Sequence, residues 1–161
     1  MEKVLFVCTG NSCRSVMGEG LFKKIAKENG LKASCSSAGI STADGYPSTD
    51  ATIRALRDAG VDMSAHRSRQ LTRSMILEAD RIFVMEYIHR DWILEVAPEA
   101  RGKVRLIGEF SSSDFAKDVE TGIPDPIRMS DGFYKNVLVT IRDCVENIVR
   151  QMLADERRAL K

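Results

Sequence analysis

Residues 8–15 read Cys8-Thr9-Gly10-Asn11-Ser12-Cys13-Arg14-Ser15. This segment follows an apolar run at residues 4–7 and precedes a helical pattern that begins near Met17. The sequence therefore predicts a loop that joins a buried strand to the first turn of a helix. A loop of small and polar residues in this setting can turn successive backbone N–H groups inward and form a nest for an anion.

Two side chains indicate what such a nest would do. The following helix points its unpaired N–H groups and the positive end of its dipole at the same place. Arg14 adds a planar guanidinium that can hold two phosphate oxygens at once. The same positive field favours the thiolate of Cys8. We therefore interpret Cys8 as a nucleophile directed at phosphorus and residues 9–15 as the phosphate-binding loop. The alternative is an ordinary strand-to-helix turn with a buried cysteine.

Length and composition suit one folded domain over residues 1–161, with 43% hydrophobic and 29% charged residues. The net charge of +1 offers no broad basic surface, so we expect neither a nucleic-acid nor a membrane partner. Four irregularly spaced cysteines do not suggest a disulfide framework, and their spacing with the histidines does not suggest a metal site. The N-terminus lacks a signal-peptide pattern, and a nucleophilic thiol needs a reducing compartment. A cytoplasmic enzyme is expected.

Hydrophobic patterning predicts alternating strands and helices. Strands are expected at residues 3–8, 31–37, 81–85 and 104–107. Helices are expected at residues 15–29, 51–59, 72–78, 87–96 and 131–152. Residues 61–70 and 110–126 are predicted to be loops, and the tail at residues 155–158 to be solvated and frayed. This alternation indicates an α/β domain with a parallel sheet, whose ligands bind beyond the carboxyl ends of the strands.

A second chemical group is a carboxylate near the C-terminus. Asp125 lies between Pro124 and Pro126, which restrict its backbone. A carboxylic acid held over a phosphate site could protonate the departing oxygen. From the residues alone, an aspartate that starts a turn is the favoured interpretation. Rival acids in the same region are Asp114, Asp118 and Asp131.

The loop at residues 8–15 resembles the signature of the low-molecular-weight protein tyrosine phosphatase family, and Asp125-Pro126 matches a second family motif. The resemblance covers nearly the whole chain and lies near the bacterial protein arginine phosphatases. It implies a doubly wound, four-stranded parallel sheet of order 2-1-3-4, flanked by helices, with the phosphate loop after the first strand. It also implies hydrolysis through a phosphocysteine at Cys8, with Arg14 binding the phosphoryl group and Asp125 as the general acid. The expected substrate is a phosphorylated protein and the product inorganic phosphate, without metal or cofactor.

The resemblance also implies roles for residues around the loop. Asn11 matches an asparagine that holds a left-handed turn, and Ser37 and His66 match positions that brace the loop through hydrogen bonds. Cys13 matches a cysteine that can form a disulfide with the nucleophile under oxidation. A surface or core histidine stays the alternative for His66, and a packed small residue the alternative for Cys13. His89 lies in a charged helix and is expected to be exposed.

Other activities use the same loop. Related arsenate reductases pass oxidation to further cysteines after the third strand, and residues 85–104 contain none. A non-catalytic phosphate-binding module is disfavoured because Cys8, Arg14 and Asp125 are all present. Hydrolysis of a phosphate monoester is therefore the favoured class.

Within hydrolysis, phosphoarginine is a rival substrate to phosphotyrosine. The arginine phosphatases resemble this chain at the loop and at residues 37–39, and they carry a small polar residue at the position of Ser12. Against this, Ser41 stands where such an enzyme would place an aromatic wall. Tyrosine phosphatases usually carry an aromatic pair after Asp-Pro, where this chain has Ile127 and Arg128. The residues leave the two substrates open.

Overall fold

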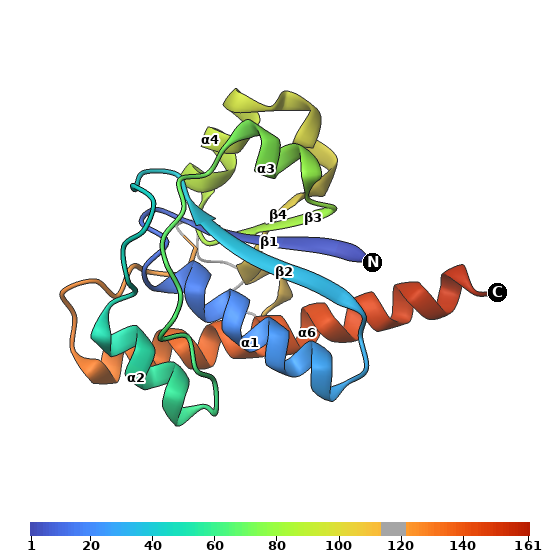
Figure 1. Ribbon diagram of the computed structural model, residues 1–161. Helices are drawn as coiled ribbons and strands as arrows, with labels where there is room; N and C mark the ends of the chain where they lie inside the picture. The colour runs from blue at the N-terminus through green and yellow to red at the C-terminus, as the bar shows by residue number, and fades with distance from the viewer. Residues whose placement is uncertain (114–121) are drawn as a thin grey trace.

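Figure 1 shows the computed structural model of the chain, which describes residues 1–113 and 122–161. Its four parallel strands are β1 (Glu2–Cys8), β2 (Ala33–Gly39), β3 (Arg81–Val84) and β4 (Val104–Leu106). They lie in the order β2-β1-β3-β4, which confirms the predicted topology. The change of direction between β1 and β3 places the carboxyl end of β1 at the switch point, where parallel sheets bind their ligands.

Helices cover both faces of this sheet (Figure 1). One layer contains α1 (Arg14–Glu28) and α6 (Asp131–Ala159), with α2 (Asp50–Asp58) packed against both. The other layer contains α3 (Arg73–Glu78) and α4 (Tyr87–Val96). Two short 3-10 helices, η1 (Pro98–Lys103) and η2 (Ile107–Phe110), flank β4. Among the described residues, no helix combines the length and the apolar character needed to cross a membrane.

The central strand is buried on both faces, as its continuous apolar run predicts. Val4, Phe6 and Cys8 belong to the core beneath α1 and α6, whereas Leu5 and Val7 belong to the core beneath α3 and α4. This division follows from the two-residue side-chain period of a strand. Cys8 therefore ends β1 on the α1 face, directly before the loop.

The last helix differs from its prediction. It continues to Ala159, so the expected frayed tail at residues 155–158 is helical. Asp155 lies 3.1 Å from Arg81 at the start of β3, and this ion pair holds the last turns against the sheet.

The loop at residues 61–70 is confirmed, with only isolated bridges at Arg67 and Gln70. The predicted loop at residues 110–126 begins at Phe110, the last residue of η2, and its residues 114–121 lie outside the described residues.

The end of β2 supports the loop from one side. Ile40 donates its backbone N–H to Cys8 O at 3.0 Å, and Ser41 donates to Thr9 O at 3.0 Å. A Cβ on Gly39 would lie 2.6 Å from Thr9 O and 2.9 Å from Asn11 N. Glycine is needed here because the loop backbone occupies the space of a side chain.

We predict that Gly39→Ala displaces the loop. The extra carbon meets backbone rather than a flexible side chain, so overpacking should cost about 1–3 kcal/mol of unfolding free energy. The urea concentration at the midpoint of unfolding should decrease, and so should the hydrolysis of phosphate monoesters that the sequence predicts. Gly102→Ala is the control, because a Cβ at Gly102 has no neighbour within 4 Å. An unchanged Gly39→Ala protein would contradict this account of the loop.

Candidate active site

The loop between β1 and α1 has the geometry of an anion nest. Asn11 has a φ of 51°, the left-handed conformation that asparagine tolerates. Within the described part of the chain, the backbone N–H groups of residues 9–13 have no hydrogen-bond acceptor. No side chain caps the start of α1 at Cys13. Free N–H groups and an uncapped helix start favour an anion at this place.

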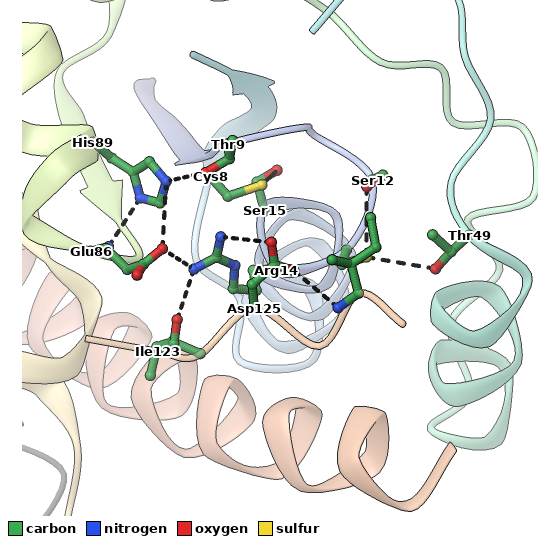
Figure 2. Close-up of polar contacts among 12 residues, drawn as sticks. Cys8, Thr9, Ser12, Arg14, Ser15, Thr49, Glu86, His89, Ile123 and Asp125 are labelled. Atoms are coloured by element: carbon green, nitrogen blue, oxygen red, sulfur yellow. Dashed lines mark hydrogen bonds and ion pairs between the residues drawn. The ribbon is translucent and has the colours of Figure 1, made fainter. Parts of the chain in front are cut away.

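Arg14 is held in the protein interior, with 2% of its surface exposed. Its Nη1 donates to Glu86 Oε2 at 2.5 Å and to Ile123 O at 2.8 Å, and its Nη2 lies 3.6 Å from Asp125 Oδ2 (Figure 2). A buried cation is costly unless charge and hydrogen bonds compensate it. Glu86 and Ile123 supply this compensation and fix the orientation of the guanidinium. The sequence prediction missed Glu86, whose partner is distant in the chain.

A chain of hydrogen bonds reaches the sulfur of Cys8. Cys8 Sγ lies 2.9 Å from Ser15 Oγ. Asn11 Nδ2 donates to Ser15 Oγ at 2.8 Å and to Ser37 Oγ at 2.9 Å, while Asn11 Oδ1 accepts from the backbone N–H of Arg69 at 3.0 Å. Because Ser15 Oγ accepts from the amide, its own proton is free to point at the sulfur. Ser15 can therefore donate to a thiolate at Cys8.

This chain ends at a buried acid that the sequence prediction also missed. Ser37 Oγ donates to Glu19 Oε2 at 2.5 Å, and Lys23 Nζ donates to Glu19 Oε1 at 2.6 Å. His66 Nδ1 lies 3.6 Å from Glu19 Oε2. Burial lowers the pKa of His66, against the opposing effect of Glu19. Ser15 and Glu19 are four residues apart and share one face of α1, which is the signal that could have indicated this acid.

The prediction that His89 is exposed is wrong, because the side chain is buried. Its Nδ1 accepts the backbone N–H of Glu86 at 3.0 Å, and its Nε2 lies 2.9 Å from Thr9 Oγ1 (Figure 2). Burial and then the charge of Arg14 lower the pKa of His89 to about 4, against the opposing charge of Asp125. The three-residue spacing from Glu86 is that of a capping box, a signal present in the sequence.

Asp125 lies beside the guanidinium but remains open to solvent, with 44% of its side chain exposed. Its Oδ1 accepts the backbone N–H of Ile127 at 3.1 Å. The rival Asp131 instead begins α6 and lies 3.1 Å from Arg54. The other rivals, Asp114 and Asp118, lie outside the described residues. Of the two described acids, Asp125 is the one that contacts Arg14.

The second loop cysteine points toward α2 and α6. Cys13 Sγ lies 3.6 Å from Thr49 Oγ1 and 3.7 Å from the hydroxyl of Tyr134. All four cysteines are free thiols, so the disulfide between Cys8 and Cys13 stays a prediction. Elsewhere, burial raises the pKa of Cys144 to about 12, which keeps that core thiol protonated.

The sheet, the loop after β1 and the buried arginine together define an α/β phosphatase with a cysteine-containing phosphate loop. The family model described as low molecular weight phosphotyrosine protein phosphatase matches residues 3–159. The chain belongs to this family, whose members are hydrolases.

Relatives with two different names resemble the chain. A low molecular weight protein-tyrosine-phosphatase of Klebsiella pneumoniae, named as putative, is 33% identical over 86% of this chain and 88% of its own length. A protein-arginine-phosphatase of Bacillus subtilis is 29% identical over 96% of this chain and 99% of its own length. The crystal structure of the low molecular weight protein tyrosine phosphatase from T. tengcongensis has a TM-score of 0.85, with 29% identity over 94% of this chain and 99% of that one.

We predict that His89 makes stability depend on pH. Below pH 6.5 an unfolded histidine takes up a proton that folded His89 accepts only near pH 4, so the unfolding free energy falls as pH falls between these values. Between pH 7 and pH 5, the wild type should lose roughly 2 kcal/mol more than His89→Asn. Urea unfolding at both values measures the difference. Since His66 is present in both proteins, its titration cancels, and equal losses would contradict the prediction.

Proposed function

We propose that this enzyme hydrolyses phosphotyrosine in proteins, with Cys8 as the nucleophile, Arg14 as the phosphoryl ligand and Asp125 as the general acid. The observation that carries the proposal is the fixed guanidinium of Arg14 at one end of a loop whose other end is Cys8. The free N–H groups between them supply the remaining positive potential. Nucleophile, anion site and acid thus converge on one edge of the sheet.

In the first step the phosphoryl group lies among the loop N–H groups and the guanidinium of Arg14. The Cys8 thiolate attacks phosphorus in line with the bond to the leaving oxygen. The S–P bond forms as the P–O bond breaks, and protonated Asp125 gives its proton to the departing oxygen. The product is the free hydroxyl of the substrate together with a phosphocysteine.

In the second step water attacks the phosphocysteine. Asp125, now ionised, takes the proton of the water as the O–P bond forms and the S–P bond breaks. Ser15 donates a hydrogen bond to the departing sulfur and keeps its proton, because Asn11 already donates to the oxygen of Ser15. Inorganic phosphate leaves, and the Cys8 thiolate and protonated Asp125 are restored.

Positive charge in this mechanism comes from Arg14 and the backbone, so the proposed reaction uses no metal ion or cofactor. Within residues 1–113 and 122–161, no three His, Cys, Asp or Glu side chains are arranged to hold a metal. A thiolate nucleophile is oxidised readily, which supports a reducing, cytoplasmic location. The proposed partner is a phosphorylated protein, with no nucleic acid or membrane involved.

Phosphoarginine is the second candidate substrate. Phosphoarginine carries the same PO₃ group on a P–N bond, so the phosphate-binding loop would serve both substrates. Ser12 favours phosphoarginine, because its small, polar and partly exposed side chain leaves room for the guanidinium of the substrate and can hydrogen-bond to the N–H groups of that guanidinium. The similarity to the Bacillus subtilis arginine phosphatase supports the same choice. The exposed Ile127 beside Asp125 instead offers apolar surface to a phenol ring.

We predict that Asp125→Asn slows the first step according to the leaving group. Phenyl phosphate, with a poor leaving group, should lose about 10²–10⁴-fold in kcat/KM. Nitrophenyl phosphate should lose far less, because its phenolate departs without a proton. Asp131→Asn is the matched control, since Asp131 pairs with Arg54 away from the loop. Equal losses with both substrates would rule out an acid role for Asp125.

We predict that Ser12→Ile separates the two candidate substrates. A larger apolar side chain should lower kcat/KM for phosphoarginine peptides and preserve or raise it for phosphotyrosine peptides of the same sequence. The comparison of the wild type on both peptides decides the substrate class. Cys8→Ser should abolish turnover of both and still bind phosphate. Preference of the wild type for phosphoarginine would overturn the phosphotyrosine proposal but leave the mechanism intact.

A further inference from the structure

One contact at the loop has no part in the mechanism above. The side chain of Thr9, the residue directly after Cys8, meets the buried ring of His89 at 2.9 Å. Thr9 and His89 are 80 residues apart in the chain. The backbone of Thr9 is held separately, because Ser41 N–H donates to its carbonyl oxygen. The ring of His89 therefore positions the hydroxyl of Thr9, whereas the hydrogen bond from Ser41 positions the loop backbone.

The partners of His89 determine which ring nitrogen carries the proton. Glu86 N–H can only donate, and it points at His89 Nδ1 at 3.0 Å. Nδ1 must therefore be the accepting, unprotonated nitrogen. In a neutral imidazole the other nitrogen, Nε2, then carries the hydrogen. Because the pKa of His89 is about 4, the ring is neutral at neutral pH and this tautomer applies.

The same reasoning extends to Thr9. His89 Nε2–H donates to Thr9 Oγ1, so the hydroxyl oxygen is used as an acceptor. No acceptor in the described part of the chain takes the hydroxyl proton of Thr9. Thr9 is partly exposed, whereas its neighbour Cys8 is buried. The proton of Thr9 is thus available to a ligand in the loop.

We propose that His89 is a positioning residue, which fixes the Thr9 hydroxyl as a hydrogen-bond donor to an oxygen of the bound phosphoryl group. The inference rests on the proposed function, because it takes the loop after Cys8 as the phosphoryl site. It adds a side-chain donor to the backbone N–H groups and Arg14. Donors held in place before the reaction stabilise charge on the phosphoryl oxygens without reorganisation.

The charges around His89 keep this arrangement in place. Arg14 on α1 opposes a second proton on the ring, while Asp125 favours one. Glu86 Oε2 lies 3.9 Å from His89 Nε2, but this oxygen already accepts from Arg14. A protonated ring would also turn an Nδ1–H toward Glu86 N–H, placing two donors against each other.

The first test reads the tautomer without any turnover. Long-range ¹H–¹⁵N NMR of the wild type at pH 7 should show His89 protonated at Nε2 only. The chain has two histidines, so the spectrum of His89→Asn assigns the signals. A ring protonated at Nδ1 would overturn the proposal.

The second test is a double-mutant cycle. Thr9→Val removes the hydroxyl at nearly constant shape, and His89→Asn keeps an acceptor for Glu86 N–H but is too short to reach Thr9. Each change should lower kcat/KM and weaken the binding of inorganic phosphate about 10-fold, the loss of one hydrogen bond to a charged group. The double variant should lose about 10-fold rather than about 100-fold, because both changes remove one interaction. Thr9→Ser, which keeps the hydroxyl, should retain most of the activity.

The outcomes separate the two proposals. Additive losses in the double variant, or a Thr9→Val protein that binds phosphate as the wild type does, would overturn the role of His89 and leave the proposed function standing. If His89 served only to cap α4, His89→Asn would match the wild type in phosphate binding, which also overturns it. A wild type that neither binds phosphate nor hydrolyses phosphate monoesters would refute the proposed function, whatever the tautomer.

Discussion

The buried guanidinium of Arg14 is the constraint on which the rest of the site depends. A cation removed from water costs several kcal/mol unless charges and acceptors surround it. Glu86, at the junction of β3 and α4, supplies the charge, and the carbonyl of Ile123 supplies a further acceptor. One side chain thereby joins three segments at the carboxyl edge of the sheet. The position of Asp125, which follows Ile123 by two residues, depends on the same contact.

The site also fixes which group donates and which accepts in its hydrogen bonds. In two places a group that can only donate determines what the next group must do. The amide nitrogen of Asn11 occupies the oxygen of Ser15 and leaves the hydroxyl proton of Ser15 for Cys8. The backbone N–H of Glu86 occupies one nitrogen of His89 and leaves the other nitrogen as a donor to Thr9. Such directed chains bring donors to a thiolate and to an anion without a net positive surface, in keeping with the net charge of +1.

Choice of substrate is a separate matter from phosphoryl transfer. Phosphotyrosine and phosphoarginine carry the same PO₃ group, so neither the backbone of the phosphate-binding loop nor Arg14 distinguishes them. They differ in the leaving group, which under the proposed function lies against the walls around the loop. Ser12 and Ile127 contribute surfaces of opposite character to these walls. Relatives of both names match the chain to a similar extent, with 33% and 29% identity.

Local patterns in the sequence predicted the strand at residues 3–8, the loop after it and the positions of Cys8 and Arg14 at its two ends, because burial period, loop chemistry and helix start are properties of neighbouring residues. They also predicted the order of helices and strands, although the last helix is longer because an ion pair to Arg81 holds its end. Only the tertiary structure decided that His89 is buried and that Glu86 and Glu19 belong to the site. Glu86 meets Arg14 across 72 residues and His89 meets Thr9 across 80, and a contact at that separation depends on which strands pair and how the helices pack. No pattern within a short stretch of the chain contains that information.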